Sequence, residues 1–437
     1  MPDPEFLVIG LDGLPYSLLA DLCQSGVTPN LNRLIQAGHS ASINSSIPDV
    51  SSTAWASFMT GTNPGTHGVY GFFEARSDNY SLHFLDSNDI KAPTLWERLS
   101  DSRKKSLVIN VPQTYPAREV DGVLISGFVT PDLQKAVWPK SLLPALKDLD
   151  YSVDVDAWLA REDMDKFMED LFRVLERRVE TIHYLWDRES WDIIMAVFTG
   201  TDRLQHYLWD AVVDEGHQYH AQVMEFYHIL DGAVGTLTDK AGEDTGIIIL
   251  SDHGFTGIEK ELNLNAWLQI QGYLEFTTES PESLEDMAPE SIAFALDPGR
   301  IYLNRSGRFR HGWIEDGDEF RKYRDELRIR LADEIRIRDD AGNMVNPIEK
   351  VYLPEEIYSG PELSQAPDLI VLNNPGFDLK GSVKIDTVAR RDVLTGTHTY
   401  RDATLIGCNL PDNFDFNAIE SIEDITPKIL AAMNAEI

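Results

Sequence analysis

Residues 6–13 read Phe-Leu-Val-Ile-Gly-Leu-Asp-Gly, a short apolar run that ends in a polar turn. The same arrangement returns at residues 193–198, followed by Thr-Gly-Thr-Asp at 199–202, and at 247–250, followed by Ser-Asp-His-Gly at 251–254. Apolar runs that are short, β-branched and not alternating are typical of strands buried on both faces, as in a parallel sheet covered by helices. These stretches therefore predict an α/β fold.

Four more apolar runs, at residues 106–109, 123–125, 369–372 and 404–406, extend the pattern. Segments with helical periodicity lie between them. Residues 31–37 follow a cap-like Pro-Asn pair, and apolar residues recur about every 3.6 positions between Met164 and Trp186. This alternation of strands and helices favours a mostly parallel central sheet with helices on its faces.

Residues 266–365 differ in composition from the rest of the chain. They contain the acidic stretch 279–290, an expected strand at 300–303 and a charged helix around 319–334. We expect this segment to be an auxiliary or lid region, with approximate bounds, inserted in a single α/β domain that spans residues 1–437.

Composition and charge narrow the possible partners. With 38 Lys and Arg against 72 Asp and Glu, the 437-residue chain has a formal net charge of −34 at pH 7. Such a surface repels nucleic acids and anionic lipids, so we expect neither a nucleic-acid polymer nor a membrane as partner. Two cysteines, Cys23 and Cys408, offer no disulfide framework and favour a reducing compartment. Because the sequence also shows no signal-peptide pattern, we expect a cytoplasmic protein, with its oligomeric state open.

Acidic and imidazole side chains stand just after the apolar runs. Ligands of open α/β sheets bind outside the carboxyl ends of the strands, and four such residues follow runs directly: Asp12, Asp202, Asp252 and His253. His206 lies four residues after Asp202, so both would face one side of a helix and could hold one ion. His398 precedes the run at 404–406. Carboxylate plus imidazole is the ligand mixture expected for zinc or manganese rather than magnesium or calcium.

A hydroxyl-rich segment supplies a candidate nucleophile. Residues 47–61, Ile-Pro-Asp-Val-Ser-Ser-Thr-Ala-Trp-Ala-Ser-Phe-Met-Thr-Gly, read as a loop that enters a helix. The structural interpretation is a cluster of N-caps, since Ser and Thr are favoured there. The functional interpretation is that unpaired N–H groups and the positive end of the helix dipole suit an alkoxide and a phosphate. Metal coordination is one way to activate such a serine.

These motifs resemble the type I phosphodiesterase/nucleotide pyrophosphatase family of the alkaline phosphatase superfamily. The resemblance rests on five motifs in order: Gly-Leu-Asp-Gly at 10–13, the serine turn with Thr60-Gly61 and His67-Gly68, Asp202-x3-His206, Asp252-His253-Gly254 and Gly-Thr-His at 396–398. Further similarity at 110–112, 126–128 and 299–304 extends it over most of the chain. It implies an alkaline-phosphatase-like three-layer sandwich.

The family pattern implies two divalent metal ions, which we expect to be zinc, with manganese as the alternative. By position, one ion would be held by Asp202, His206 and His398. The other would be held by Asp12, Asp252, His253 and the Ser51 hydroxyl. Ser51 stands nine residues before Thr60, where the family has its nucleophilic Thr.

One position departs from the family pattern. The nucleotide pyrophosphatase branch has an Asn three residues after the nucleophile, where it contacts a phosphoryl oxygen, and Ala54 stands there in this chain. Trp55 and Tyr207 lie near the site motifs and are expected as substrate contacts, because their rings could stack on a base or an aryl group.

We therefore expect a metal-dependent phosphodiesterase or nucleotide-pyrophosphatase-like hydrolase that acts on a small phosphate ester. Three Asp and two divalent ions would leave a local charge of −3 + 4 = +1, which attracts phosphate despite the acidic chain. A phosphomonoesterase or phosphomutase with the same two-metal site is the first alternative, and a non-catalytic metal or phosphate sensor is the second. A sulfatase is disfavoured, since residues 51–55 lack the Cys/Ser-x-Pro-x-Arg pattern.

Overall fold

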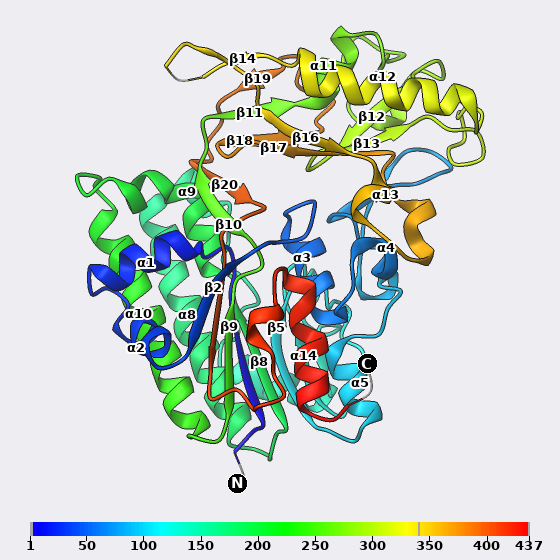
Figure 1. Ribbon diagram of the computed structural model, residues 1–437. Helices are drawn as coiled ribbons and strands as arrows, with labels where there is room; N and C mark the ends of the chain where they lie inside the picture. The colour runs from blue at the N-terminus through cyan, green and yellow to red at the C-terminus, as the bar shows by residue number, and fades with distance from the viewer. Residues whose placement is uncertain (1–2, 340, 436–437) are drawn as a thin grey trace.

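The computed structural model describes residues 3–339 and 341–435. Within these residues the largest sheet has the strand order β2-β21-β9-β1-β8-β5-β6-β7 (Figure 1). Its parallel strands are β9 (Gly246–Leu250), β1 (Phe6–Leu11), β8 (Ile193–Phe198), β5 (Ser106–Val111) and β6 (Gly122–Ser126). The antiparallel neighbours are β21 (Ala403–Cys408) beside β9, β2 (His39–Ile43) beside β21, and β7 (Val137–Trp138) beside β6. The predicted mostly parallel α/β sheet is confirmed.

Helices cover both faces of this sheet. Successive side chains of each strand point to opposite faces, so each buried strand contributes to two hydrophobic cores. Leu7 and Ile9 of β1 pack in one hydrophobic core, and Phe6 and Val8 pack in the other. The first core is completed by α1 (Tyr16–Gln24), α2 (Pro29–Ala37), α8 (Met164–Trp186), α9 (Gly200–Val213) and α10 (His220–Ala241). The second is completed by α3 (Ser51–Thr60), α5 (Leu95–Asp101) and α14 (Ile425–Ala432). The result is the predicted alkaline-phosphatase-like three-layer sandwich.

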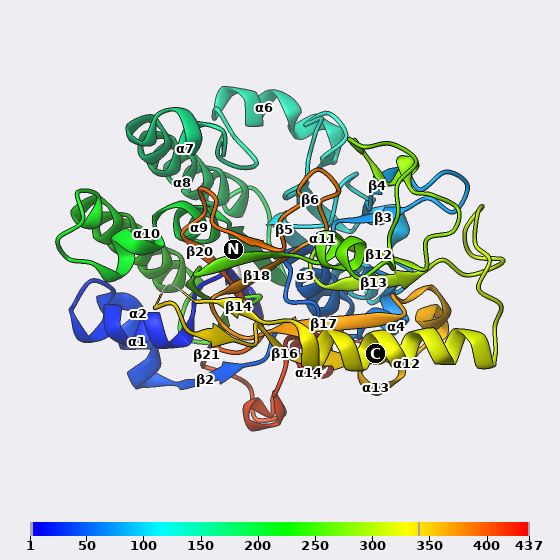
Figure 2. The same cartoon turned by 90° about the horizontal axis from the view of Figure 1, so that it is seen from above.

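A second set of sheets lies at one end of the sandwich (Figures 1 and 2). An antiparallel sheet contains β12 (Ala293–Leu296), β13 (Arg300–Leu303), β17 (Leu369–Asn373) and β16 (Ile348–Tyr352), beside α11 (Leu264–Ile270) and α12 (Asp318–Glu334). A smaller sheet joins β18 (Phe377–Lys380), β11 (Lys260–Asn263) and β19 (Ala389–Arg390). The chain leaves the sandwich through β10 (Gly254–Gly257) and returns through β20 (Gly396–Thr399), which pair with each other. That residues 266–365 act as a lid stays a prediction.

Two apolar runs differ from the predicted parallel strands. The run at 369–372 forms β17 of the antiparallel sheet, and the run at 404–406 forms β21, which is antiparallel to β9. Leu369 and Ile370 pack in two different hydrophobic clusters, so β17 is covered on both faces. Burial on both faces makes a run continuously apolar whatever the direction of the neighbouring strand.

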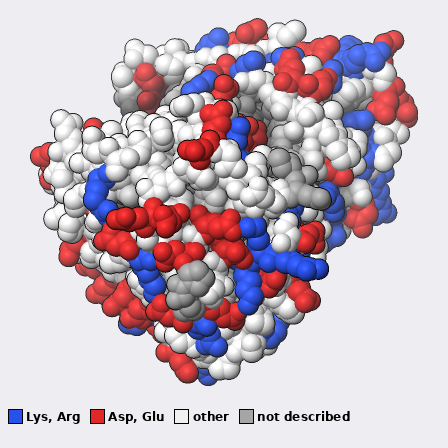
Figure 3. Space-filling model, turned by 60° about the horizontal axis from the view of Figure 1, so that its bottom comes forward, with Lys and Arg blue, Asp and Glu red and all other residues white. Residues whose placement is uncertain are grey.

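The surface is acidic, as the net charge predicts. Asp and Glu side chains cover much of the face in Figure 3, with Lys and Arg interspersed. Across residues 3–339 and 341–435, no helix combines the length and the apolar character needed to cross a membrane. Cys23 is partly buried, Cys408 is buried, and both are free thiols. The predicted cytoplasmic location and the exclusion of nucleic-acid polymers remain predictions.

Candidate active site

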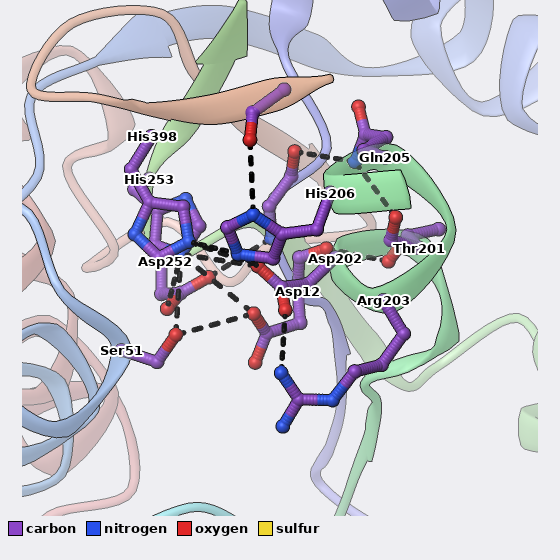
Figure 4. A network of polar contacts seen from close by, with 12 residues as sticks. Asp12, Ser51, Thr201, Asp202, Arg203, Gln205, His206, Asp252, His253 and His398 are labelled. Carbon is purple, nitrogen blue, oxygen red and sulfur yellow. Dashed lines mark hydrogen bonds and ion pairs between the residues drawn. The ribbon is translucent and has the colours of Figure 1, made fainter. Parts of the chain in front are cut away.

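Three neighbouring strands place the acidic ligand candidates at one edge of the central sheet. Asp12 follows β1, Asp202 lies in the first turn of α9 after β8, and Asp252 follows β9. Because β9, β1 and β8 are adjacent and parallel, their carboxyl ends meet, and the three carboxylates converge (Figure 4). All three side chains are buried.

Helix α9 and strand β20 build the first cluster of candidate ligands. On α9, Asp202 and His206 are one turn apart and face the same side. Strand β20 brings in His398, which lies opposite Phe255 of β10. Asp202 Oδ1 lies 3.0 Å from His398 Nε2 and 3.3 Å from His206 Nε2, and the two Nε2 atoms are 3.0 Å apart. These atoms can bind one ion together.

The second cluster surrounds His253. Its Nε2 lies 3.8 Å from Asp12 Oδ1, 3.9 Å from Asp202 Oδ1 and 3.3 Å from Asp252 Oδ2. Ser51 Oγ lies 3.2 Å from the same nitrogen and 3.5 Å from Asp12 Oδ1. Asp12, Asp202 and His253 can bind a second ion, and Asp252 is oriented beside them by the Gly13 N–H, which donates to its Oδ1 at 3.1 Å. The structure therefore brings together all seven residues expected as metal ligands.

The histidine hydrogen bonds indicate what these clusters can hold. Each Nδ1 lies beside a backbone carbonyl oxygen: His206 beside Gly396 at 3.0 Å, His253 beside Gly254 at 3.0 Å and His398 beside Asp49 at 2.9 Å. A carbonyl only accepts, so each Nδ1 carries the proton and each Nε2 presents a lone pair. The lone pairs of His206 and His398 then face each other without a donor between them. Such an arrangement fits a cation and is the usual orientation of metal-binding imidazoles.

The carboxylates also fit a cation. Buried Asp252 Oδ2 has no hydrogen-bond donor among the described residues, although His253 Nε2 lies 3.3 Å away with its lone pair. Burial, together with the charges of Asp252 and Asp202, raises the pKa of Asp12 well above its usual value. Burial raises the pKa of Asp252 to about 7, and burial and His398 lower the pKa of His253 to about 4. Asp12 and Asp252 are therefore short of positive charge, which divalent ions would supply.

Ser51 is the hydroxyl that faces the clusters. It is the first residue of α3, after the N-cap residue Val50, and no side-chain hydroxyl caps this helix. Its neighbours Ser52 and Thr53 are fully buried, and their hydroxyls have no hydrogen-bond partner within the described residues. Of the three consecutive hydroxyls, Ser51 is therefore the one that contacts the candidate ligands.

The two aromatic rings expected as substrate contacts, Trp55 and Tyr207, pack against other parts of the protein, and neither is among the residues that line the pocket at the clusters. Their contact with a substrate stays a prediction. Trp55 is fully buried, and its indole Nε1 donates to Asp12 Oδ2 at 2.9 Å, so it supports a ligand candidate from behind. Tyr207 is partly buried and packs edge-to-face on Phe167 of α8, with ring centroids 5.4 Å apart. It lies five residues after Asp202, which on a helix of 3.6 residues per turn is far around from the ligand face.

Two supporting residues escaped the sequence analysis. Thr201 Oγ1 donates to the carbonyl of Asp12 at 2.5 Å, and Gln205 Nε2 donates to the carbonyl of Gly13 at 2.9 Å. Thr201 directly precedes Asp202, and Gln205 directly precedes His206. Their place beside the two ligand candidates of the Asp202-x3-His206 motif is the sequence feature that could have indicated them. Gly13 has φ +68°, and a Cβ there would lie 3.2 Å from His253 Cε1. The turn after β1 thus needs glycine and is held by α9.

A pocket of about 230 Å³ opens on the clusters. Besides Asp12, Ser51, Asp202, His206 and His398, it is lined by Phe72, Phe73, Phe84, Pro112, Phe128, Val129, Thr199 and Arg203. Phe73 and Phe84 come from the hairpin of β3 (Phe73–Ala75) and β4 (Leu82–Phe84). No lining residue found among the described parts of the chain comes from 266–365. Ala54, at the position of the family Asn, is fully buried and is not among the residues that line the pocket.

Comparison with known proteins agrees with this architecture. The model of the family "Type I phosphodiesterase / nucleotide pyrophosphatase" matches residues 6–401. The chain belongs to this family. Its members are divalent-metal-dependent hydrolases of phosphoric esters, and the resemblance seen in the sequence is confirmed. A search of curated proteins found no match.

Solved structures share the fold at low sequence identity. Phosphonoacetate hydrolase from Sinorhizobium meliloti 1021, in complex with phosphonoformate, has a TM-score of 0.64 at 18% identity. The alignment covers 99% of this chain and 97% of the hydrolase chain. An inactive variant of murine ectonucleotide pyrophosphatase/phosphodiesterase 5, in complex with AMP, has a TM-score of 0.57 at 14% identity, with 99% and 96% coverage. The human form of the latter protein has a TM-score of 0.55 at 14% identity, with 99% and 95% coverage.

Proposed function

We propose that this protein is a phosphodiesterase/nucleotide-pyrophosphatase-like hydrolase that uses Ser51 as nucleophile and two zinc ions. The observation that carries the proposal is the convergence of three imidazole Nε2 lone pairs, buried carboxylates and the Ser51 hydroxyl at one helix N-terminus. A purely structural metal site would not need a serine hydroxyl among its neighbours. A small phosphate ester remains the expected substrate.

The two clusters suggest how the ions would be shared. Asp202, His206 and His398 would hold one ion. Asp12, Asp252, His253 and Ser51 would hold the other, with Asp202 Oδ1 near both clusters. Mixed nitrogen and carboxylate ligands favour zinc. Bound divalent ions would supply the charge that activates a serine hydroxyl and stabilises a leaving oxygen.

The chain's own residues then account for the remaining chemistry. Ser51 Oγ attacks phosphorus from the side opposite the leaving oxygen, so that the P–O bond to the leaving group breaks and a phosphoseryl group forms. The first N–H groups of α3 lie beside Ser51 and can bind a phosphoryl oxygen. Water then attacks the phosphoseryl phosphorus, which releases the phosphate product and restores Ser51.

The test compares two neighbouring serines. Ser51→Ala should lower hydrolysis of bis-(p-nitrophenyl) phosphate by about 10⁴-fold or more, as expected for loss of a nucleophile, while the zinc content stays near wild type. Ser52→Ala is the matched control, since this buried hydroxyl contacts none of the ligands, and its activity should remain within about threefold of wild type.

Substrate choice is read from the same assay. After removal of metal with EDTA and restoration with zinc or manganese, the rate on the diester is compared with that on p-nitrophenyl phosphate. A metal-dependent preference for the diester supports the proposal. Near-normal activity of Ser51→Ala overturns the nucleophile assignment, and a preference for the monoester replaces phosphodiesterase by phosphatase or mutase.

A further inference from the structure

Arg203 occupies a position that the family pattern does not explain. It follows Asp202 directly on α9, and its guanidinium reaches the Asp202 carboxylate (Figure 4). It lines the same pocket as Ser51. It also lines an adjoining cavity of about 520 Å³, which shares Phe128 and Val129 with the pocket. The guanidinium thus stands at the boundary between the metal-ligand clusters and an outer space that is open to a substrate.

The guanidinium is held rigidly at this boundary. Asp154 Oδ2 accepts from its Nε at 2.9 Å and from its Nη2 at 2.8 Å, while Nη1 donates to Asp202 Oδ2 at 3.1 Å. Its carbon lies 4.3 Å from the centroid of the Phe128 ring. Asp154 is itself fixed by Thr199 Oγ1 at 3.0 Å. A side chain restrained in this way pays little further entropy when a ligand binds.

These contacts leave part of the guanidinium available. Arginine has five N–H donors, and its hydrogen bonds to Asp154 and Asp202 use three of them. Within the described residues, Nη1 keeps one N–H that has no hydrogen-bond acceptor. The same atom lies against Asp202 Oδ2, while Asp202 Oδ1 faces the two histidines. Nη1 is therefore close enough to the first cluster to donate to a phosphate oxygen that approaches it from the pocket.

We propose that Arg203 binds a non-bridging oxygen of the phosphoryl group that is transferred, and so takes the place of the amide donor that is missing at Ala54. The inference rests on the proposed function, because it assumes that phosphate binds at the ligand clusters. Donors already fixed in place stabilise charge on such an oxygen without reorganising during the reaction. Arg203 is then a substrate-binding residue of this site, not only a support for Asp202.

The geometry matters here more than the charge. Asp154 offsets the positive charge of Arg203, so the pair adds no net charge to the pocket. Its contribution is a planar fork that bonds Asp154, Asp202 and an anion together, which one lysine ammonium cannot reproduce. Arg203→Lys should consequently behave much more like Arg203→Ala than like the parent protein.

The experiment measures binding of inorganic phosphate, so it does not depend on turnover. The parent protein for this comparison is zinc-loaded Ser51→Ala, which cannot form a phosphoserine at residue 51. It is freed of excess zinc, and its binding of phosphate is measured by calorimetric titration. Adding Arg203→Ala should weaken phosphate binding by about 10- to 100-fold, the range for loss of a charge-assisted hydrogen bond. Zinc content, measured on the same samples, should not change. Arg188→Ala is the matched control, because this exposed arginine bonds only to Tyr184 among the described residues, and it should leave phosphate binding unchanged.

Three other results overturn the proposal. Unchanged phosphate affinity with zinc bound shows that Arg203 does not contact the anion. A loss of zinc that accounts for the weaker binding shows that Arg203 acts only through Asp202. Full affinity in Arg203→Lys contradicts the fork geometry. Phosphate binding by the parent protein without any esterase activity in the wild type would instead reject the proposed function and leave the role of Arg203 intact.

Discussion

Among single residues, Trp55 shows how a side chain buried behind the site can hold a candidate metal ligand in place. Its indole N–H is the protein donor to Asp12 Oδ2, and the ring itself is fully buried under the cluster. Groups that hydrogen-bond a metal ligand from behind fix its orientation, and their loss typically weakens metal binding 10- to 100-fold. We therefore expect this tryptophan, which the sequence suggests as a stacking surface, to act as a positioning residue.

Trp55→Phe tests this role. Phenylalanine keeps an aromatic ring in the core but removes the N–H, so we expect zinc affinity to fall by about 10- to 100-fold. A chelator competition assay measures it. Trp96→Phe is the matched control, because Trp96 lies in the same hydrophobic cluster and, within the described residues, its indole donates to no candidate ligand. Equal zinc affinity in the two variants would contradict a specific role for the indole N–H.

At the scale of elements, the contact between β1 and α3 links the sheet to Ser51, the proposed nucleophile. Gly10 of β1 lies against Trp55 of α3, and a Cβ at Gly10 would be 2.5 Å from Trp55 Cη2 and 2.9 Å from Val197 Cγ2. This close approach lets α3 lie near enough to the end of β1 for Ser51 to reach Asp12. The glycine is required by packing and not by its backbone conformation.

Gly10→Ala should therefore lower the free energy of unfolding by about 1–3 kcal/mol, the usual cost of overpacking a core. Urea unfolding measures it. Gly232→Ala in α10 is the control, since no atom lies within 4 Å of its added Cβ, and it should stabilise by about 0.5–1 kcal/mol. Phenylalanine lacks the outer indole atoms, so Trp55→Phe should relieve the clash with the added Cβ. The double variant Gly10→Ala with Trp55→Phe should therefore lose less unfolding free energy than the two single variants lose in sum. Simple additivity would show that the strain lies elsewhere.

Elements also show where sequence patterns are informative. Continuous apolar runs predicted β1, β8 and β9, and the polar residues after them predicted the carboxylate cluster, because strand ends are local features. The same pattern could not assign β17 or β21 to its sheet, since burial on both faces is independent of strand direction. Contacts such as those of Arg203 with Asp154 or Trp55 with Asp12 join distant segments and leave no periodic signal.

On the scale of the whole molecule, the candidate ligands come from segments spread between Asp12 and His398. The strand order of the central sheet makes the three carboxylates neighbours, and α9 and β20 add the histidines His206 and His398. The sheet thereby concentrates Asp12, Asp202 and Asp252 at one buried edge, in a chain that already carries a net charge of −34. Folding without a cation must bury these carboxylates beside one another. Burial first, and the charges of neighbouring carboxylates in addition, raise the pKa values of Asp12 and Asp252. Metal binding should therefore stabilise the molecule as a whole.

Removal of zinc with EDTA should lower the free energy of unfolding by about 4 kcal/mol for each zinc site, relative to protein with free zinc at about a thousand times the Kd of that site. Acid should weaken the binding. The pKa of Asp252 without metal is about 7, so its carboxyl must lose a proton before it binds zinc between pH 6 and pH 8. His253, with a pKa of about 4, is already neutral over that range. Zinc affinity should consequently be at least about tenfold weaker at pH 6 than at pH 8.

Chelator competition at pH 6 and pH 8 measures the two zinc affinities. Asp252→Asn is the informative control. The asparagine should weaken zinc binding at both pH values, but it has no carboxyl proton to lose. Its affinity should change less between pH 6 and pH 8 than that of the wild type. If the wild-type affinity is the same at both values, the carboxylates are already ionised without metal, and their repulsion is not what the ions relieve.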